Sequence, residues 1–279
     1  MTMFKRTITG LVLLGMLFLI LYLTSFTRFV FDGLVMLFAI LASIEMYKAM
    51  KRLNYHPSGI SIIFILVTIF PLCYFFDYVG LLISFILSFL TAFIVFIFNS
   101  KKNFWDFVIS ILVLIYPVLL LGLAFVMNNL YGILPIMFAV SAALMSDTIA
   151  YYGGSFFGKK KIFPKISPKK TYAGSLLGLL GGALGGLLVY ALFEIANYPA
   201  HIKFTFSQVS DYPYIIYIFL GIFMALCSEI GDLGASRIKR EVGLKDYGTL
   251  LGSHGGVMDR IDSVLFSLAI MSVFMYFVF

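Results

Sequence analysis

The chain has 279 residues, of which 62% are hydrophobic and only 12% are charged, and its mean hydropathy is +1.04. Soluble domains are typically about 45–50% apolar and about 25% charged. This composition therefore excludes an ordinary water-soluble protein and predicts an integral membrane protein in contact with a lipid bilayer. The net charge of +7 does not indicate nucleic-acid binding, because the basic residues fall in short loops between apolar segments.

Apolar segments long enough to cross a bilayer recur along the chain. A membrane-spanning helix needs about 20 apolar residues, and in lipid its backbone groups must be hydrogen-bonded within the segment. We predict an all-α polytopic membrane protein with about nine transmembrane helices. They are expected at residues 8–27, 29–49, 59–76, 78–98, 104–127, 130–151, 172–194, 212–233 and 262–279. The first lacks a small-residue cleavage site, so we expect it to be retained.

The basic residues predict the orientation of these helices, because cytoplasmic loops are enriched in Lys and Arg. With a cytoplasmic N-terminus, 18 of the 20 Lys and Arg residues lie on the cytoplasmic side, and only Arg28 and Lys203 lie on the far side. We therefore predict a cytoplasmic N-terminus and a C-terminus on the far side. The strong bias favours a bacterial inner membrane, with an ER or organellar membrane as the alternative.

Charge is distributed unevenly between two regions of the chain. Residues 1–130 are apolar spans joined by short loops, which predicts an N-terminal transmembrane scaffold of about five helices. Within it, Glu45 is expected to lie near the membrane interface beside Lys48. Residues 131–279 contain the charged clusters and are predicted to form a catalytic transmembrane region with its site on the cytoplasmic face.

Acidic side chains gather near the predicted cytoplasmic ends of the last two spans. Asp232, Ser236 and Lys239 have the spacing i, i+4, i+7, which places them along one face of a helix. Asp259 and Asp262 are three residues apart and would share another face. Carboxylates near membrane depth are usually paired or functional, and a set of oxygen ligands favours Mg²⁺. The alternative to a divalent metal site is salt bridging to Arg237, Arg240 and Arg260.

Two further segments have features typical of phosphate binding. The sequence "SPKKT" places Lys169, Lys170 and Thr171 before a helix, where free amides attract anions. Near the C-terminus, Gly255 and Gly256 follow His254 and would allow a ligand to approach the backbone closely. The alternatives are that the lysines only set topology and that His254 is structural.

A ridge of glycines begins the span after "SPKKT". Its members recur every four residues and are Gly174, Gly178, Gly182 and Gly186. Small residues with this spacing allow another helix to approach closely, either within the chain or in a dimer.

Acids for a metal, lysines for phosphates and a lipid setting indicate phosphoryl or nucleotidyl transfer to a lipid. Residues 236–262 resemble the signature of the phosphatidate cytidylyltransferases (CDP-diacylglycerol synthases), S-x-hydrophobic-K-R-x4-K-D followed by H-G-G-hydrophobic-x-D-R-hydrophobic-D. The segments "SDTIAYYGG" and "SPKKT" also resemble this family, so the similarity covers about residues 146–262. One departure is Ala173, where the family usually has Glu, and Glu229 is a candidate substitute.

The resemblance implies that the phosphate of phosphatidate attacks the α-phosphorus of CTP, giving CDP-diacylglycerol and pyrophosphate. It also implies Mg²⁺, a second cation such as K⁺, and a homodimer. The residues expected to act in catalysis are Ser236, Lys239, Asp246 and Arg260. Those expected to bind the substrates are Lys169, Lys170, Thr171, Arg240, Lys245, His254, Gly255 and Gly256. Those expected to bind the metal are Asp232, Asp259 and Asp262.

Three other functions compete with this assignment. A CTP-dependent polyprenol or phytol kinase would need a base for the lipid hydroxyl, a role open to Asp246. A transporter is disfavoured because the charges gather at one interface and the two halves show no repeat. An inactive scaffold homologue is suggested only by Ala173.

Overall fold

The computed structural model describes residues 27, 29–196, 203–250 and 255–278. The first predicted span, apart from residue 27, and His254 lie outside these residues. Within them there are helices and no strand, apart from isolated bridge positions such as the pair Lys161 and Thr171, so the all-α prediction is confirmed. The elements are α2 (Phe29–Arg52), α3 (Gly59–Phe98), α4 (Phe104–Val113), the π-helix η1 (Leu114–Leu119), α5 (Leu120–Leu130), α6 (Leu134–Phe157), α7 (Tyr172–Tyr190), the π-helix η2 (Ala191–Ile195), the 3-10 helix η3 (Phe206–Gln208), α8 (Pro213–Glu241) and α9 (Met258–Val278).

Seven helices in the described part of the chain are long and apolar enough to cross a membrane, as expected for an integral membrane protein. The longest, α3, is bent at Asp77, whose backbone is non-helical with φ 49° and ψ −126°. The hydroxyls of Thr68 and Ser84 lie 2.8 Å apart on opposite sides of this bend, so the chain folds back on itself. The predicted spans 59–76 and 78–98 are the two arms of this hairpin, while the total of nine spans and the orientation stay predictions.

Three predicted spans are too short, and the missing ends of two of them, in α8 and α9, carry charge. Helix α6 continues to Phe157, α8 continues to Glu241, and α9 begins at Met258, where spans of 130–151, 212–233 and 262–279 were predicted. Hydropathy falls as soon as charged residues appear, but a helix continues wherever its polar side chains find partners. The extensions contain Ser236, Lys239 and Asp259, so all three lie on helices.

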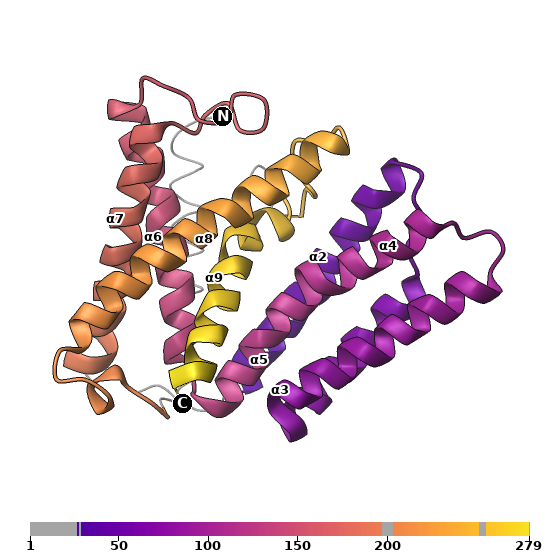
Figure 1. Ribbon diagram of the computed structural model, residues 1–279, viewed down its shortest axis with the longest axis horizontal. Helices are drawn as coiled ribbons and strands as arrows, with labels where there is room; N and C mark the ends of the chain where they lie inside the picture. The colour runs from indigo at the N-terminus through magenta and orange to yellow at the C-terminus, as the bar shows by residue number, and fades with distance from the viewer. Residues whose placement is uncertain (1–26, 28, 197–202, 251–254, 279) are drawn as a thin grey trace.

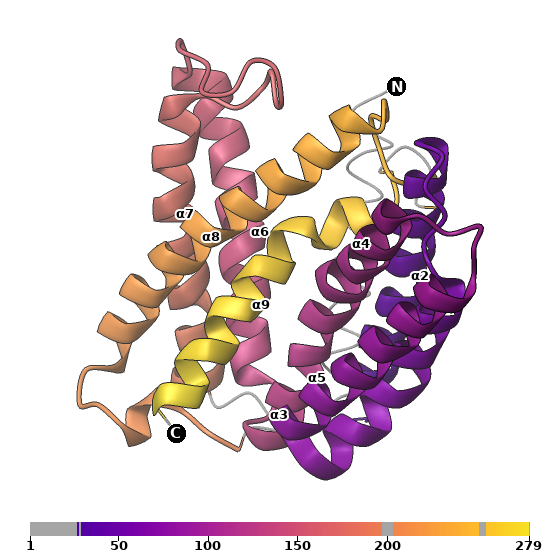
Figure 2. The ribbon, with the colours of Figure 1, turned by 45° about the vertical axis from the view of Figure 1, so that its right-hand side comes forward.

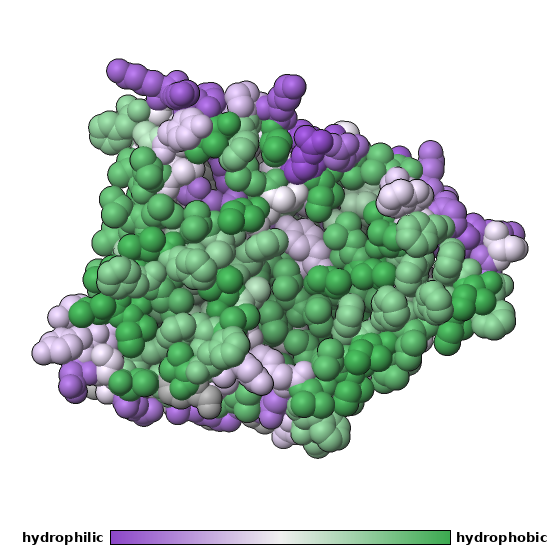
Figure 3. Space-filling model, in the orientation of Figure 1, coloured by the Kyte–Doolittle hydropathy of each residue, from purple (hydrophilic) through white to green (hydrophobic). Residues whose placement is uncertain are grey.

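The helices form two groups with α9 between them. Figures 1 and 2 show α2–α5 on one side of α9 and α6–α8 on the other. The end of α8 and the start of α9 lie at the same end of the molecule as the loop that joins α6 to α7, and we call this the site end. Figure 3 shows apolar atoms over the middle of one face, with hydrophilic atoms along its upper and lower margins.

The glycine ridge of α7 is used within the chain. A Cβ atom on Gly182 would lie 2.3 Å from the carbonyl oxygen of Gly221 in α8, and one on Gly186 would lie 2.3 Å from that of Tyr217. On the α6 side, a Cβ on Gly185 would lie 2.6 Å from the carbonyl oxygen of Ser141. Helix α7 therefore contacts the backbones of α6 and α8, which brings the site-end residues of these three helices together.

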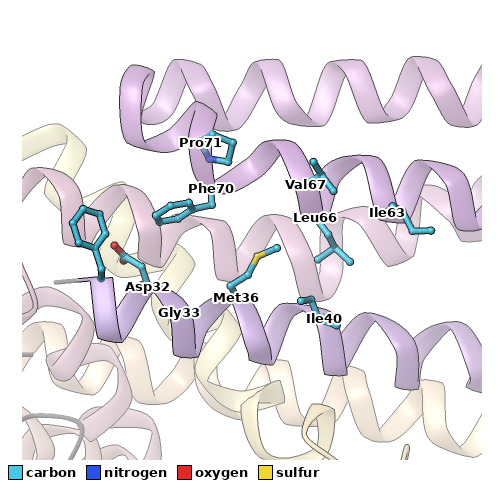
Figure 4. Close-up of a pocket in the computed structure, with 10 residues that line it drawn as sticks. Asp32, Gly33, Met36, Ile40, Ile63, Leu66, Val67, Phe70 and Pro71 are labelled. Carbon is cyan, nitrogen blue, oxygen red and sulfur yellow. The ribbon is translucent and has the colours of Figure 1, made fainter. Parts of the chain in front are cut away.

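A mostly apolar pocket of about 610 Å³ lies between α2 and the first arm of α3 and includes Met36, Ile40 and Leu66 (Figure 4). Its polar member, Asp32, is buried and accepts a hydrogen bond of 2.8 Å from the side-chain amide of Asn128. The pocket belongs to the α2–α5 group and has none of the site residues in its wall.

Replacing Gly182 with Ala should destabilise the protein by about 1–3 kcal/mol, because the added methyl group overpacks a backbone contact. The measurement is the thermal unfolding midpoint of the detergent-solubilised protein. Gly33→Ala is the matched control, since a Cβ on this α2 glycine meets nothing within 4 Å. Equal midpoints for the two variants would contradict the close α7–α8 contact.

Candidate functional site

Asp259 is held in the first turn of α9 by three donors. Its Oδ1 atom accepts a hydrogen bond of 2.8 Å from the Lys239 Nζ atom. Its Oδ2 atom accepts backbone N–H bonds from Tyr247 at 2.8 Å and Gly256 at 2.9 Å. With a side chain only 4% exposed, this carboxylate joins α8, the loop that follows α8, and α9.

Lys239 is a cation buried between acidic groups. Its Nζ atom lies 2.8 Å from Asp259 Oδ1 and 3.6 Å from Asp262 Oδ2, and 5.4 Å from the centre of the Tyr247 ring. The Tyr247 hydroxyl donates to the carbonyl oxygen of Ala235 at 3.2 Å. Burial, together with the charges of Asp262 and Asp259, raises the pKa of Tyr247 well above its usual range, so the ring stays neutral above the lysine.

A second ion pair joins α8 to the loop before α7. Lys170 Nζ lies 2.7 Å from Asp232 Oδ2 and donates to the carbonyl oxygen of Glu229 at 3.4 Å. Ser236 donates to Asp232 Oδ1 at 3.5 Å, as their i, i+4 spacing predicts. The Asp232 side chain is 28% exposed, which makes it the accessible acid of the group. The predicted face of Asp232, Ser236 and Lys239 is thus present on α8, although its two charged ends pair with different partners.

Asp147 of α6 also faces this site, a residue that the predicted site residues did not include. Its Oδ2 atom accepts a hydrogen bond of 3.0 Å from the Ser263 hydroxyl, next to Asp262 in α9. This bond places Asp147 beside Asp262, and Asp232 lies on the same face of α8 as Lys239, the ion-pair partner of Asp262. An acid within an otherwise apolar span was the sequence signal that could have identified Asp147.

The predicted metal ligands differ in the oxygen atoms that they can offer. Asp262 Oδ1 accepts the N–H of Ser263 at 2.9 Å, whereas Oδ2 is buried without a hydrogen-bond partner among the described residues. Both oxygens of Asp259 are occupied by Lys239 and the two amides. The described residues contain no group of three His, Cys, Asp or Glu side chains placed to hold a metal. Asp262 Oδ2, which lies 3.6 Å from the Lys239 ammonium, and the accessible Asp232 nevertheless have the donor chemistry that Mg²⁺ prefers.

The "SPKKT" segment brings one of its lysines into the site and leaves the other in solvent. Thr171 is buried and caps α7 by accepting the N–H of Gly174 at 3.2 Å. This cap directs the preceding Lys170 towards Asp232, while Lys169 is exposed. The structure therefore gives Thr171 a structural contact and Lys170 a site contact.

The alternative of arginine salt bridges is not seen for Arg237 and Arg240, because Asp232, Asp259 and Asp262 pair with lysines. Arg237 pairs with Glu241 at 2.5 Å on the outside of α8. Arg240 donates to the carbonyl oxygens of Ile166 and Leu244, both at 3.3 Å, and so joins two loops. Arg260 is exposed in the first turn of α9, and exposed Lys245 and Asp246 lie in the loop after α8.

Glu45 of α2 is part of the same constellation, through contacts with the start of α9, while its place near the membrane interface beside Lys48 stays a prediction. The residue is only 9% exposed, and its carboxylate accepts the N–H groups of Val257 at 3.1 Å and Met258 at 2.8 Å. Gly256 has no room for a side chain because a Cβ there would lie 2.3 Å from Glu45 Oε2. Gly255 has a φ of +81°, which favours glycine.

Glu229 lies in α8, one turn before Asp232, and faces α7. A Cβ on Gly178 would be 2.7 Å from its Oε1 atom and 3.2 Å from the hydroxyl of Ser146. Lys170 donates a hydrogen bond to the backbone carbonyl oxygen of Glu229. Glu229 therefore supplies an acid near Lys170. It comes from α8, whereas Ala173, the position where the family usually has Glu, belongs to α7.

Several curated proteins are similar to part of this chain. The phosphatidate cytidylyltransferase of Bacillus subtilis (strain 168) is 33% identical over 148 residues, which cover 53% of this chain and 48% of that protein. The phosphatidate cytidylyltransferase of Haemophilus influenzae is 32% identical over 148 residues, with 53% and 48% covered. That of Aquifex aeolicus is 35% identical over 160 residues, with 57% and 53% covered. The chain thus spans about half the length of these curated relatives.

A family model extends the similarity beyond these segments. The model described as the Cytidylyltransferase family matches residues 4–278, which include the α2–α5 group as well as the site. The chain therefore belongs to the Cytidylyltransferase family.

Proposed function

We propose that this protein is a phosphatidate cytidylyltransferase, which transfers CMP from CTP to phosphatidate and releases pyrophosphate. The observation that carries the proposal is the pairing of Lys170 with Asp232 and of Lys239 with Asp259 and Asp262, at one end of a membrane-spanning bundle. Phosphates need cationic neutralisation, and the reacting lipid headgroup must lie near the membrane surface. The names of the curated relatives support the same substrates.

The residues of this chain would act mainly by positioning and by charge neutralisation. The phosphatidate phosphate is already anionic, so no strong base is needed at the attacking oxygen. Lys170 is the accessible cation of the site, and on nucleotide binding it would exchange its contact with Asp232 for a phosphate oxygen. Lys239 is fixed by Asp259 and would hold its charge at a constant place while negative charge grows on the departing pyrophosphate.

Asp232 and Asp262 are the residues that would hold Mg²⁺, with Asp147 close by. When bound, the cation supplies Lewis-acid stabilisation of the phosphate oxygens. Asp259 would act on the site through Lys239, because both of its oxygens already accept hydrogen bonds. A second cation such as K⁺ is also part of the proposal, without assigned ligands.

The proposed setting is a bacterial inner membrane with the site facing the cytoplasm, supported by the clustering of basic residues at the site end. A homodimer is also proposed from the resemblance. Its interface would lie away from the glycine ridge of α7, because α6 and α8 already cover that ridge.

The purified chain in detergent should form CDP-diacylglycerol from labelled CTP and phosphatidate. Product formation should require Mg²⁺ and stop with EDTA. A parallel reaction that contains a polyprenol in place of phosphatidate tests the kinase alternative. Phosphorylated polyprenol without any CDP-diacylglycerol would refute the proposed function.

Lys170→Met should lower kcat/KM for CTP by about 10- to 100-fold, because a hydrogen bond to a charged group contributes about 1.5–3 kcal/mol. Lys165→Met is the matched control, since Lys165 is an exposed lysine of the same loop and should retain activity within about twofold. Equal losses in the two variants would show that only the overall charge of the loop matters.

Asp262→Asn should raise the Mg²⁺ concentration for half-maximal activity by about 10-fold or more. Substitutions around a metal site typically lower metal affinity by about this factor. Mn²⁺ binding measured by EPR without substrates should weaken in parallel. Asp259→Asn should reduce the thermal midpoint more and the Mn²⁺ affinity less, because its oxygens organise the α9 turn. The reverse order would assign the metal to Asp259.

A further inference from the structure

The described part of α2–α5 contributes one carboxylate directly to the turn that carries the site acids. Glu45 Oε1 accepts the Val257 N–H and Oε2 accepts the Met258 N–H, so both oxygens are engaged. These are first-turn amides of α9, which have no partner within the helix. A carboxylate at this position is favoured by the helix dipole and makes strong, charge-assisted hydrogen bonds.

Two glycines of the site end provide the space for this carboxylate. A Cβ on Gly248 would lie 2.2 Å from Glu45 Oε1, and a Cβ on Gly256 would lie 2.4 Å from the same atom. Any larger residue at either position would displace Glu45. The spacing of these glycines in the 236–262 segment thus has a physical cause in a residue of α2.

Three successive amides at the start of α9 are divided between two carboxylates. The N–H of Gly256 donates to Asp259 Oδ2, and those of Val257 and Met258 donate to Glu45. The other oxygen of Asp259 accepts the Lys239 ammonium. A shift of this turn relative to α2 would therefore move Asp259 and the lysine bound to it.

We propose that Glu45 is a positioning residue for the transfer reaction: it fixes the start of α9 so that Asp259 and Asp262 hold Lys239 in its reactive place. The kinetic test of this role rests on the proposed function, because it measures CDP-diacylglycerol formation. It makes α2 part of the active site's support, although Glu45 lies far from the 236–262 segment in sequence.

The chain contains a matched control for this role. Glu194 in η2 also accepts two successive backbone amides, from Phe206 at 2.8 Å and Ser207 at 3.1 Å. Its partners follow α7, away from the site end, and it also accepts a hydrogen bond of 2.7 Å from the Tyr217 hydroxyl. Substituting Glu45 removes such a carboxylate at the site end, and substituting Glu194 removes one away from it.

The first experiment compares Glu45→Gln with Glu194→Gln in the purified full chain. Glutamine keeps the size of the side chain but presents an N–H group to one of the two amides. Both variants should lower the thermal midpoint. Glu45→Gln should also lower kcat for CDP-diacylglycerol formation at least 10-fold with little change in KM for CTP, whereas Glu194→Gln should keep kcat within twofold. Equal kcat values for Glu45→Gln and wild type, or equal kcat losses in both variants, would overturn the proposal.

The second experiment does not depend on turnover. In a double-mutant cycle on the thermal midpoint, Gly248→Ala should be strongly destabilising in the wild type and much less so in the Glu45→Ala background, because the side chain that it displaces is gone. Additive effects would contradict the clamp. A wild-type protein that makes no CDP-diacylglycerol would refute the proposed function, while a non-additive cycle would still establish the contact between Glu45 and the glycine.

Discussion

The buried pair of Lys239 and Asp259 is the interaction on which the site end depends. A lysine enclosed by helices in a membrane protein is costly unless an acid compensates its charge. Asp259 provides that charge through one oxygen and uses the other to accept the Tyr247 and Gly256 amides. One carboxylate therefore determines the place of a cation, the path of the loop after α8 and the start of α9.

The position of Asp259 depends in turn on helices outside the charged segment. Helix α9 lies between the two helix groups (Figure 2), and its first turn is bound by Glu45 of α2. Apolar packing alone would allow α9 to slide, because lipid tails and apolar side chains offer similar surroundings. Hydrogen bonds from directed amides to a buried carboxylate restrict such movement, which explains why a polar contact is located at this junction.

Close packing of α7 against α6 and α8 serves the other side of the site. Glycines let the helix backbones meet, so Asp147 of α6 and Asp232 of α8 come near each other beside Lys170. Larger residues on α7 would separate these helices and weaken the convergence of charge. The apolar framework and the polar site are thus linked by the same helix crossings.

The sequence alone determined the class of the protein and several of the residues that the structure brings together at the site end. Composition requires a lipid environment, the hydrophobic segments identify the described helices, and the 236–262 segment contains Lys239, Asp259 and Asp262, which lie in contact. Helical periodicity also predicts the face shared by Asp232 and Ser236. Each of these depends on residue type or on local spacing, which the sequence displays directly.

The tertiary structure decided which of these residues meet. Lys239 could pair with any nearby acid, and only the crossing of α8 and α9 selects Asp259. Glu45 lies in an apolar helix without motif neighbours, and Asp147 lies in the "SDTIAYYGG" segment, far in sequence from Ser263. Their contacts with the α9 amides and with Ser263 therefore arise from long-range packing. The charged ends of α8 and α9 were missed for the same reason, because hydropathy measures the cost of exposing a charge to lipid and does not detect the partner that removes that cost.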